Sequence, residues 1–198
     1  MSILVLTSDT LIGTPATGNL EYNGQFYGTD SNASRAQMQR ITQGTAVAST
    51  SGTSIDFTGL PAWVKRITVI FNVVSTNGTS TIQVQIGSSA GIVTSGYSAT
   101  NTGMSSAVAS SSITTGFPIN GGVADASNVI AGNLILTNLT GNTWVSSHAV
   151  QARTSTAACA VGGGVSPSLP GVLDRVRITT VNGTDTFDAG SINILYEG

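Results

Sequence analysis

The stretch that decides the fold reads Leu173-Asp-Arg-Val-Arg-Ile-Thr-Thr-Val181, then Asn182-Gly183, then Thr184-Asp-Thr-Phe-Asp-Ala-Gly-Ser-Ile-Asn-Ile-Leu-Tyr196. Apolar and polar residues alternate on both sides of the Asn-Gly pair, as they do in half-buried β-strands. Asn-Gly between two such runs is the strongest short-range hairpin signal, because a type I′ turn requires positive φ at both central residues. The sequence therefore predicts a terminal β-hairpin that closes a β-domain.

The same signal occurs earlier, at Asn77-Gly78. It separates an alternating run at Val64–Ser75 from a second run at Thr81–Gly87. In the first run the predicted inward face consists of Ile67, Val69, Phe71 and Val73. We therefore predict a second Asn-Gly hairpin here.

Further short runs separated by turn-forming residues predict strands throughout residues 45–198. These lie at Ala46–Ser49, Ser54–Phe57, Ile92–Ala99, Ser112–Phe117, Val129–Asn138, Thr143–Gln151 and Thr156–Val165. Residues 88–112 contain few large apolar residues and predict either a long excursion or a strand with a wide loop around Ala99–Ser106. Many short strands at this spacing indicate an antiparallel β-sandwich, and we expect it to be jelly-roll-like.

The sequence pattern of residues 1–44 differs from that of the later strands, and we predict that these residues form a short N-terminal extension. Leu20–Tyr22 and Gln25–Tyr27 flank Asn23-Gly24 and predict a miniature hairpin. A hairpin of this size is not stable alone, so we expect it to pack on the main domain or on neighbouring subunits. Residues 32–41 fit a short helix or an extended linker.

The amino-acid composition excludes some classes of function. Only 8% of the 198 residues are charged, Lys65 is the only lysine, and the net charge is −2. This excludes the basic footprint of a nucleic-acid-binding protein. We also expect no secretory signal and no membrane insertion, because the first apolar run is short and no run reaches about 20 residues. Cys159, the only cysteine, is expected to be buried.

The titratable residues do not form a catalytic pattern, and we predict no catalytic, cofactor or metal site. His148, the only histidine, is expected to be a sheet or interface residue, with a ligand, pH-switch or symmetric metal-site role as the alternative. Asp185 and Asp188 are interpreted as turn residues and not as a glycosidase or Ca²⁺ pair. Gly87-Ser-Ser-Ala-Gly91 has the letters of a nucleophile elbow without the following helix, so it predicts a turn. Gly162-Gly-Gly164 predicts close backbone approach or a wide turn.

Aromatic residues in the loop-rich middle are candidates for contact with a receptor. Tyr97 and Phe117 lie in or beside that region, and exposed aromatic rings on loops suit stacking on sugars. Core packing is the alternative for each ring. Trp63, by contrast, is expected in the core.

Three segments resemble parts of known proteins. Pro15-Ala-Thr-Gly-Asn-Leu-Glu-Tyr-Asn-Gly-Gln-Phe-Tyr-Gly-Thr-Asp-Ser-Asn-Ala-Ser-Arg35 resembles a module of the form AGxLEYDGxxFYxTxxxxR, which recurs in tailed-bacteriophage fibres and other phage structural proteins. Residues 173–197 resemble the C-terminal sequence of such proteins, most recognisably at residues 185–194. Gly59-Leu-Pro-Ala-Trp-Val-Lys-Arg-Ile-Thr-Val69 fits as well.

The resemblance implies a virion structural protein that forms a homotrimer and contacts other virion proteins. The N-terminal segment, with Leu20, Tyr22, Phe26 and Tyr27, would attach to the particle or form the three-fold contact, and the sandwich would face a host surface glycan or protein. Because the chain has no long shaft repeat or heptad run, we expect a compact tip or spike, made in the host cytoplasm and carried on the virion. A capsid decoration protein or head fibre, and a free carbohydrate-binding β-sandwich module, are the alternatives.

Overall fold

The structure, a computed structural model, describes residues 10, 11, 13, 14, 16–23, 25–153 and 157–198. The described residues contain strands and turns but no helix, and every strand pairing among them is antiparallel. The chain divides into two compact units, Met1–Arg40 and Ile41–Gly198. This division lies four residues before the predicted boundary at 44–45, because residues 41–43 form a strand of the second unit.

The first unit is a three-stranded sheet of β1 (Leu20–Tyr22), β2 (Phe26–Thr29) and β3 (Arg35–Gln37) in that order. The predicted miniature hairpin is confirmed as β1 and β2. The short helix considered for residues 32–41 is wrong, because β3 occupies its centre. The Asp30 carboxylate accepts the backbone N–H groups of Asn32 and Ser34, both at 2.9 Å, and this turn returns the chain to pair with β2.

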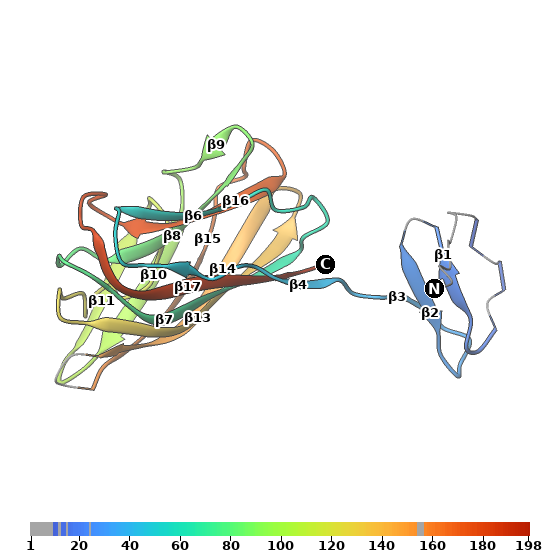
Figure 1. Cartoon of the computed structure of the whole chain (residues 1–198), viewed down its shortest axis with the longest axis horizontal. Helices are drawn as coiled ribbons and strands as arrows, with labels where there is room; N and C mark the ends of the chain where they lie inside the picture. Colours follow the sequence, from blue (N-terminus) through green and yellow to red (C-terminus); the bar gives the residue numbers. More distant parts are fainter. Residues whose placement is uncertain (1–9, 12, 15, 24, 154–156) are drawn as a thin grey trace. The chain divides into compact units, whose positions relative to one another are not determined.

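The second unit contains two sheets, drawn as facing layers in Figure 1. The larger sheet has nine strands in the order β11-β10-β15-β14-β13-β7-β17-β4, with β5 also paired to β17. Its strands are β4 (Ile41–Gln43), β5 (Val47–Ala48), β7 (Arg66–Thr76), β10 (Ser98–Met104), β11 (Val108–Ile113), β13 (Val129–Thr140), β14 (Thr143–Arg153), β15 (Cys159–Val165) and β17 (Phe187–Glu197).

The smaller sheet has five strands in the order β12-β8-β16-β6, with β9 also paired to β8. These strands are β6 (Ser54–Thr58), β8 (Ile82–Ser88), β9 (Gly91–Ile92), β12 (Phe117–Pro118) and β16 (Leu173–Thr180). Alternate residues of both sheets point inward and form one apolar core, which includes Ile67, Val69, Ile86, Leu134, Ile178 and Ile192. The predicted all-β, antiparallel sandwich is confirmed.

Neither Asn-Gly pair of this unit closes a hairpin. β7 lies in the larger sheet and β8 in the smaller one, and β16 and β17 are divided in the same way. Of the four residues in the two pairs, all of which are described, only Gly183 has a positive φ, at +68°. A type I′ turn needs two such residues, so both hairpin predictions are wrong. Each Asn-Gly pair instead carries the chain from one sheet to the other.

The two crossings lie against each other. The backbone N–H of Asn77 donates to the Thr186 carbonyl at 2.9 Å, and the N–H of Thr186 donates to the Asn77 side-chain oxygen at 2.8 Å. The N–H of Asn182 donates to the Ser80 hydroxyl at 3.0 Å. Each crossing therefore satisfies backbone groups of the other, which an isolated turn could not do.

A β-bulge interrupts the alternation in β7. Val73 has φ +54° and is 47% exposed, whereas Val74 is fully buried. The pairing with β13 shifts register at this point, so two residues of β7 stand opposite one residue of β13. Predicting Val73 on the inward face was therefore wrong, because the extra residue moves the inward position to Val74.

Residues 98–113 form two paired strands and not the predicted wide loop. Residues 98–104 form β10, and a tight turn at Ser105–Ala107 leads into β11, with the Ser105 N–H donating to the Ala107 carbonyl at 2.9 Å. The prediction of a wide loop around Ala99–Ser106 is wrong. Its small and hydroxylated residues form a strand pair at the edge of the larger sheet instead.

Candidate binding sites

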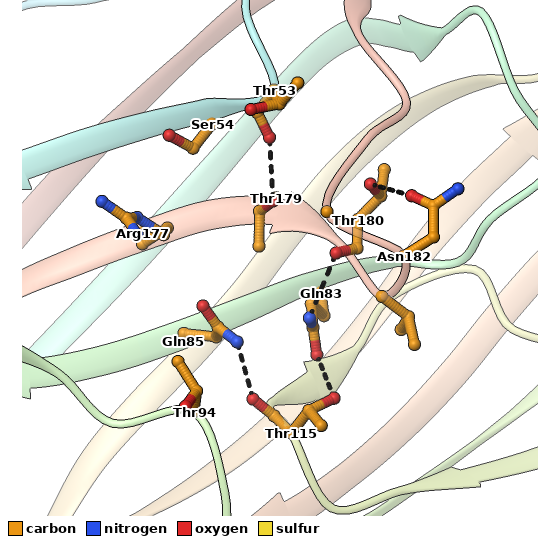
Figure 2. Close-up of a pocket in the computed structure, with 12 residues that line it drawn as sticks. Thr53, Ser54, Gln83, Gln85, Thr94, Thr115, Arg177, Thr179, Thr180 and Asn182 are labelled. Carbon is orange, nitrogen blue, oxygen red and sulfur yellow. Dashed lines mark hydrogen bonds between the residues drawn. The ribbon is translucent and has the colours of Figure 1, made fainter.

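A polar groove of about 310 Å³ lies on the outer face of the smaller sheet (Figure 2). Its floor is formed by outward residues of two neighbouring strands, Gln83 and Gln85 on β8 and Arg177 and Thr179 on β16. The register places Thr179 opposite Gln83 and Arg177 opposite Gln85. Residues from four other segments surround this floor: Thr53 and Ser54, Thr94, Thr115, and the turn from Thr180 to Gly183.

The two glutamines are held in place and nearly buried, at 2% exposure for Gln83 and 5% for Gln85. The Gln83 amide donates to the Thr180 carbonyl at 3.2 Å and accepts from the Thr115 hydroxyl at 2.8 Å. The Gln85 amide donates to the Thr115 carbonyl at 2.8 Å. These hydrogen bonds, dashed in Figure 2, leave the Gln85 Oε1 as an acceptor with no partner among the described residues.

The groove has little net charge. Arg177 is its only charged lining residue, and its Nε and Nη2 groups donate to the two carboxylate oxygens of Asp56, each at 2.7 Å. The hydrogen bond with Asp56 raises the pKa of Arg177. A two-point pairing of this kind fixes the plane of the guanidinium.

An apolar face on the first unit is the second candidate site. Leu20, Phe26 and Met38 are 62%, 44% and 54% exposed and border a hollow of about 370 Å³. Tyr22 stands opposite Phe26 across β1 and β2, with ring centroids 5.0 Å apart. Within the described part of this unit no second layer covers these residues.

The four residues predicted for attachment do not share one face. Tyr27 pairs with Glu21, so both lie on the opposite side of the sheet from Leu20 and Phe26. Glu21 on that side accepts two hydrogen bonds from Arg35, at 2.8 and 3.1 Å. Sequence reasoning missed Met38, because it lies just beyond the unpredicted strand β3.

The predicted receptor-contact aromatics are in the core. Tyr97 and Phe117 are 2% and 1% exposed and meet edge to face with centroids 5.1 Å apart. The Tyr97 hydroxyl accepts from the Ile86 N–H at 2.9 Å and donates to the Val93 carbonyl at 3.0 Å. Burial raises the pKa of Tyr97 to about 12. The core packing considered for each ring is therefore confirmed, and their placement as exposed rings is wrong: Phe117 pairs with Val84 as part of the smaller sheet, and the Tyr97 hydroxyl is held by the backbone of β8. Trp63 packs on the core, 5.8 Å from the Tyr196 ring.

His148 lies inside the sandwich, within the sheet as predicted. It stands opposite Gly162, which in turn stands opposite Asn101, so the three form a row across β14, β15 and β10. A Cβ at Gly162 would lie 2.6 Å from the Asn101 Cβ, the His148 Cε1 and the Thr100 carbonyl oxygen, so only a glycine fits here. The close approach predicted for Gly162–Gly164 is confirmed, and the wide turn is wrong because these residues lie within β15. Neither ring nitrogen of His148 has a hydrogen-bond partner among the described residues. Burial lowers the pKa of His148 to about 4, and the nearby Ile119 backbone offsets this only in part.

The structure also shows the outcome of the predictions made for Cys159, for the Gly87–Gly91 segment and for two aspartates. Cys159 is exposed, so its predicted burial is wrong: it points outward on β15, whereas its neighbour Ala160 points inward. Ser89 and Ala90 form the turn between β8 and β9, as predicted for the Gly87–Gly91 segment. Asp185 and Asp188 bond to backbone and hydroxyl groups near the crossings.

Among the described residues there is no long apolar helix of the kind that crosses a membrane. In the same part of the chain, no three His, Cys, Asp or Glu side chains gather where they could hold a metal ion. Comparisons with models of protein families, with curated proteins and with solved structures gave no match. The two candidate sites must therefore be interpreted from their own geometry.

The sequence carries one signal for the groove. Gln83 and Gln85 alternate with Ile82, Val84 and Ile86, which marks them as outward residues of one strand. The signal is weak, because outward amides are ordinary on a solvated sheet. Only the tertiary structure brings Thr94 and Thr115 over these amides and makes the face concave.

Proposed function

We propose that this chain is a non-enzymatic structural protein of a tailed-bacteriophage virion, a trimeric tail-fibre or spike component that contacts the host cell surface. The observation that carries the proposal is the exposed apolar face of Leu20, Phe26 and Met38. Leu20 and Phe26 lie in the segment that resembles the phage module, and Met38 lies three residues beyond it. Three short strands cannot bury such a face by themselves, and exposed apolar patches mark protein contacts.

The two units suit two tasks. The first unit would mount the protein, either on the particle or at the contact between three copies. The second unit would face the host, and its polar groove is a concave surface able to bind a ligand. In this proposal the chain is made in the host cytoplasm and is carried on the virion.

The outer face of the larger sheet supports association between copies. On four adjacent strands, the outward positions whose exposure the structure describes include these uncharged residues: Asn133 and Thr137, Ser147, Ala149 and Gln151, Cys159 and Val161, and Ser98 and Thr100. Surfaces without charge do not repel identical copies, and the central parts of subunit interfaces are depleted in charge. A homotrimer could cover part of this face.

Adsorption competition tests the proposal. The purified full chain should reduce the adsorption of the corresponding phage to its host cells, and it should sediment with those cells. Binding to purified capsids without binding to cells would favour a head-fibre or decoration protein instead. A stable monomer in light scattering at micromolar concentration, with no effect on adsorption, would contradict the proposal and favour a free binding module.

A matched pair of variants tests the mounting face. Phe26→Ser removes an exposed ring from the apolar face, whereas Val172→Ser removes an exposed apolar side chain just before β16 of the smaller sheet. We expect the first change to weaken trimer formation or incorporation into particles by about tenfold or more, since central aromatic contacts dominate interfaces. The second should leave both unchanged. Equal effects would show that the face of β1 to β3 has no special role.

A further inference from the structure

The polar groove on the smaller sheet has features beyond those of a solvated surface. Ordering and burying two long amide side chains costs conformational entropy and hydration. Gln83 and Gln85 are nevertheless buried and hydrogen-bonded to Thr115 and Thr180. The result is a rigid floor whose polar groups already point in fixed directions, which is how binding sites reduce the entropic cost of association.

Several polar groups at this floor have no partner within the described residues. They are the Gln85 Oε1, the Arg177 Nη1, and the hydroxyls of Ser54 and Thr94. The first is an acceptor, the second is a donor, and each hydroxyl can act as both. The groove therefore offers mixed donors and acceptors within a small concave space.

The charge and apolar character of the groove exclude several classes of ligand. Asp56 neutralises Arg177, so no free charge attracts a phosphate, a sulfate or an amine. The floor residues are amides, a hydroxyl and a guanidinium, and Val181 is the one aliphatic side chain in the lining, so the groove has no extended apolar wall for a lipid or an aromatic ligand. A ligand that fits must be neutral and must present alternating donors and acceptors over a short length.

We propose that this groove binds a short neutral saccharide. Sugar hydroxyls both donate and accept, which matches the mixed free groups at the floor. The volume of about 310 Å³ lies at the lower end of the range for ligand pockets, so the groove suits a short segment of a glycan. This inference rests on the proposed function, in which the sandwich contacts a host surface, and it names the ligand class.

The affinity of one groove for one saccharide should be weak. Each hydrogen bond replaces a bond to water and has a small net effect, so a dissociation constant of about one millimolar is expected. Several copies on one particle raise the effective affinity by avidity. Detection in solution therefore needs a method suited to weak binding.

The test is an NMR titration of the full chain with methyl glycosides of glucose, galactose, mannose, rhamnose and N-acetylglucosamine, and with glucuronic acid and glucosamine as charged controls. At least one neutral glycoside should shift the side-chain amide signals of Gln83 and Gln85. Gln85→Leu, which keeps the volume, should weaken that binding by about tenfold. Thr94→Val should also weaken it, and it lies on an exposed segment where it does not endanger folding.

Gln151→Leu is the matched control, because Gln151 is an exposed amide on the larger sheet. It should bind like the unchanged chain. The inference is overturned if no neutral glycoside shifts the groove signals, if the shifts fall elsewhere, if a charged sugar binds more tightly, or if Thr94→Val and Gln85→Leu bind normally.

Adsorption assays separate this inference from the proposed function. If the full chain and both groove variants compete equally with phage, the proposed function stands and the saccharide groove is refuted. If the glycosides bind the groove but the chain neither competes with phage nor binds particles, the groove stands and the virion role is refuted.

Discussion

The carboxylate of Asp185 accepts the backbone N–H of Ser80 at 3.0 Å, which joins the two crossings between the sheets. Its other oxygen accepts from the Asn182 side-chain amide at 2.6 Å. A residue of the second crossing thus satisfies a backbone group of the first, although they are 105 positions apart in the chain.

Replacing Asp185 should therefore destabilise the sandwich. Asp185→Ala leaves the Ser80 N–H without its partner, and we expect a loss of about 1–3 kcal/mol in the free energy of unfolding. Asp125→Ala is the control, because the Asp125 hydrogen bonds stay within one exposed turn at Ser127. It should cost clearly less than Asp185→Ala, because substitutions at exposed positions away from the core have small effects. Urea denaturation measures both, and equal losses would contradict a joining role for Asp185.

Gly78 should be coupled to the same carboxylate. A Cβ at Gly78 would lie 2.0 Å from the Asp185 Oδ2, so Gly78→Ala must push the carboxylate away. We expect a loss of about 1–3 kcal/mol from Gly78→Ala, and a much smaller one when Asp185→Ala is already present. Gly171→Ala, whose nearest contact is 3.4 Å away, is the control. Additive losses in the double-mutant cycle would refute the contact.

Val73 should be a site where substitution stabilises the protein. A β-branched residue at φ +54° is strained, and Asn adopts this conformation more readily. Val73→Asn is expected to raise the free energy of unfolding by about 1 kcal/mol, because the side chain is exposed and loses little packing. Val108→Asn, at an exposed strand position with no positive φ, should give no gain. A lower melting temperature for Val73→Asn than for the unchanged chain would be the contrary result.

Acid should weaken the sandwich through His148. Its pKa is about 4 in the folded protein against 6.5 in the unfolded chain. Below pH 6.5 the His148 ring is protonated in the unfolded chain but stays neutral in the folded protein. The contribution of His148 to stability therefore falls as the pH is lowered to about 4 and stays constant below that pH. The loss should be about 3 kcal/mol.

The measurement is the free energy of unfolding against pH for the unchanged chain and for His148→Leu. The difference between the two curves isolates this residue from the carboxylates, which titrate in both proteins. A constant difference between pH 7 and pH 4 would show that His148 does not resist protonation.

Tyr97 should matter for stability and not for host contact. Tyr97→Phe leaves the Ile86 N–H without its partner and should cost about 1–3 kcal/mol. Tyr196→Phe, whose hydroxyl has no hydrogen-bond partner in the described part of the chain, should stay within about 0.5 kcal/mol. Thermal unfolding measures the loss, and adsorption competition at a temperature where both variants are folded should be unchanged. Lost competition by folded Tyr97→Phe would reinstate it as a contact residue.

Much of the fold could be predicted because burial leaves a local pattern. Ile67, Val69 and Phe71 alternate with polar residues, and a strand with one buried face requires that alternation. The positions of most strands and the breaks between them were therefore readable. The candidate sites were harder to predict from the sequence than the strands. Of the four predicted attachment residues, three line one face and Tyr27 lies on the other.

The all-β character, the alternating core faces and the places where the chain turns all follow from local sequence patterns. The choice of which strands pair after each turn depends on packing in the folded domain. Asn-Gly favours a reversal of direction over a few residues, but a ladder partner is chosen by packing over the whole domain. That is why Asn182-Gly183 joins two sheets instead of closing a hairpin, and why Thr115 covers Gln83 and Gln85 to form the groove.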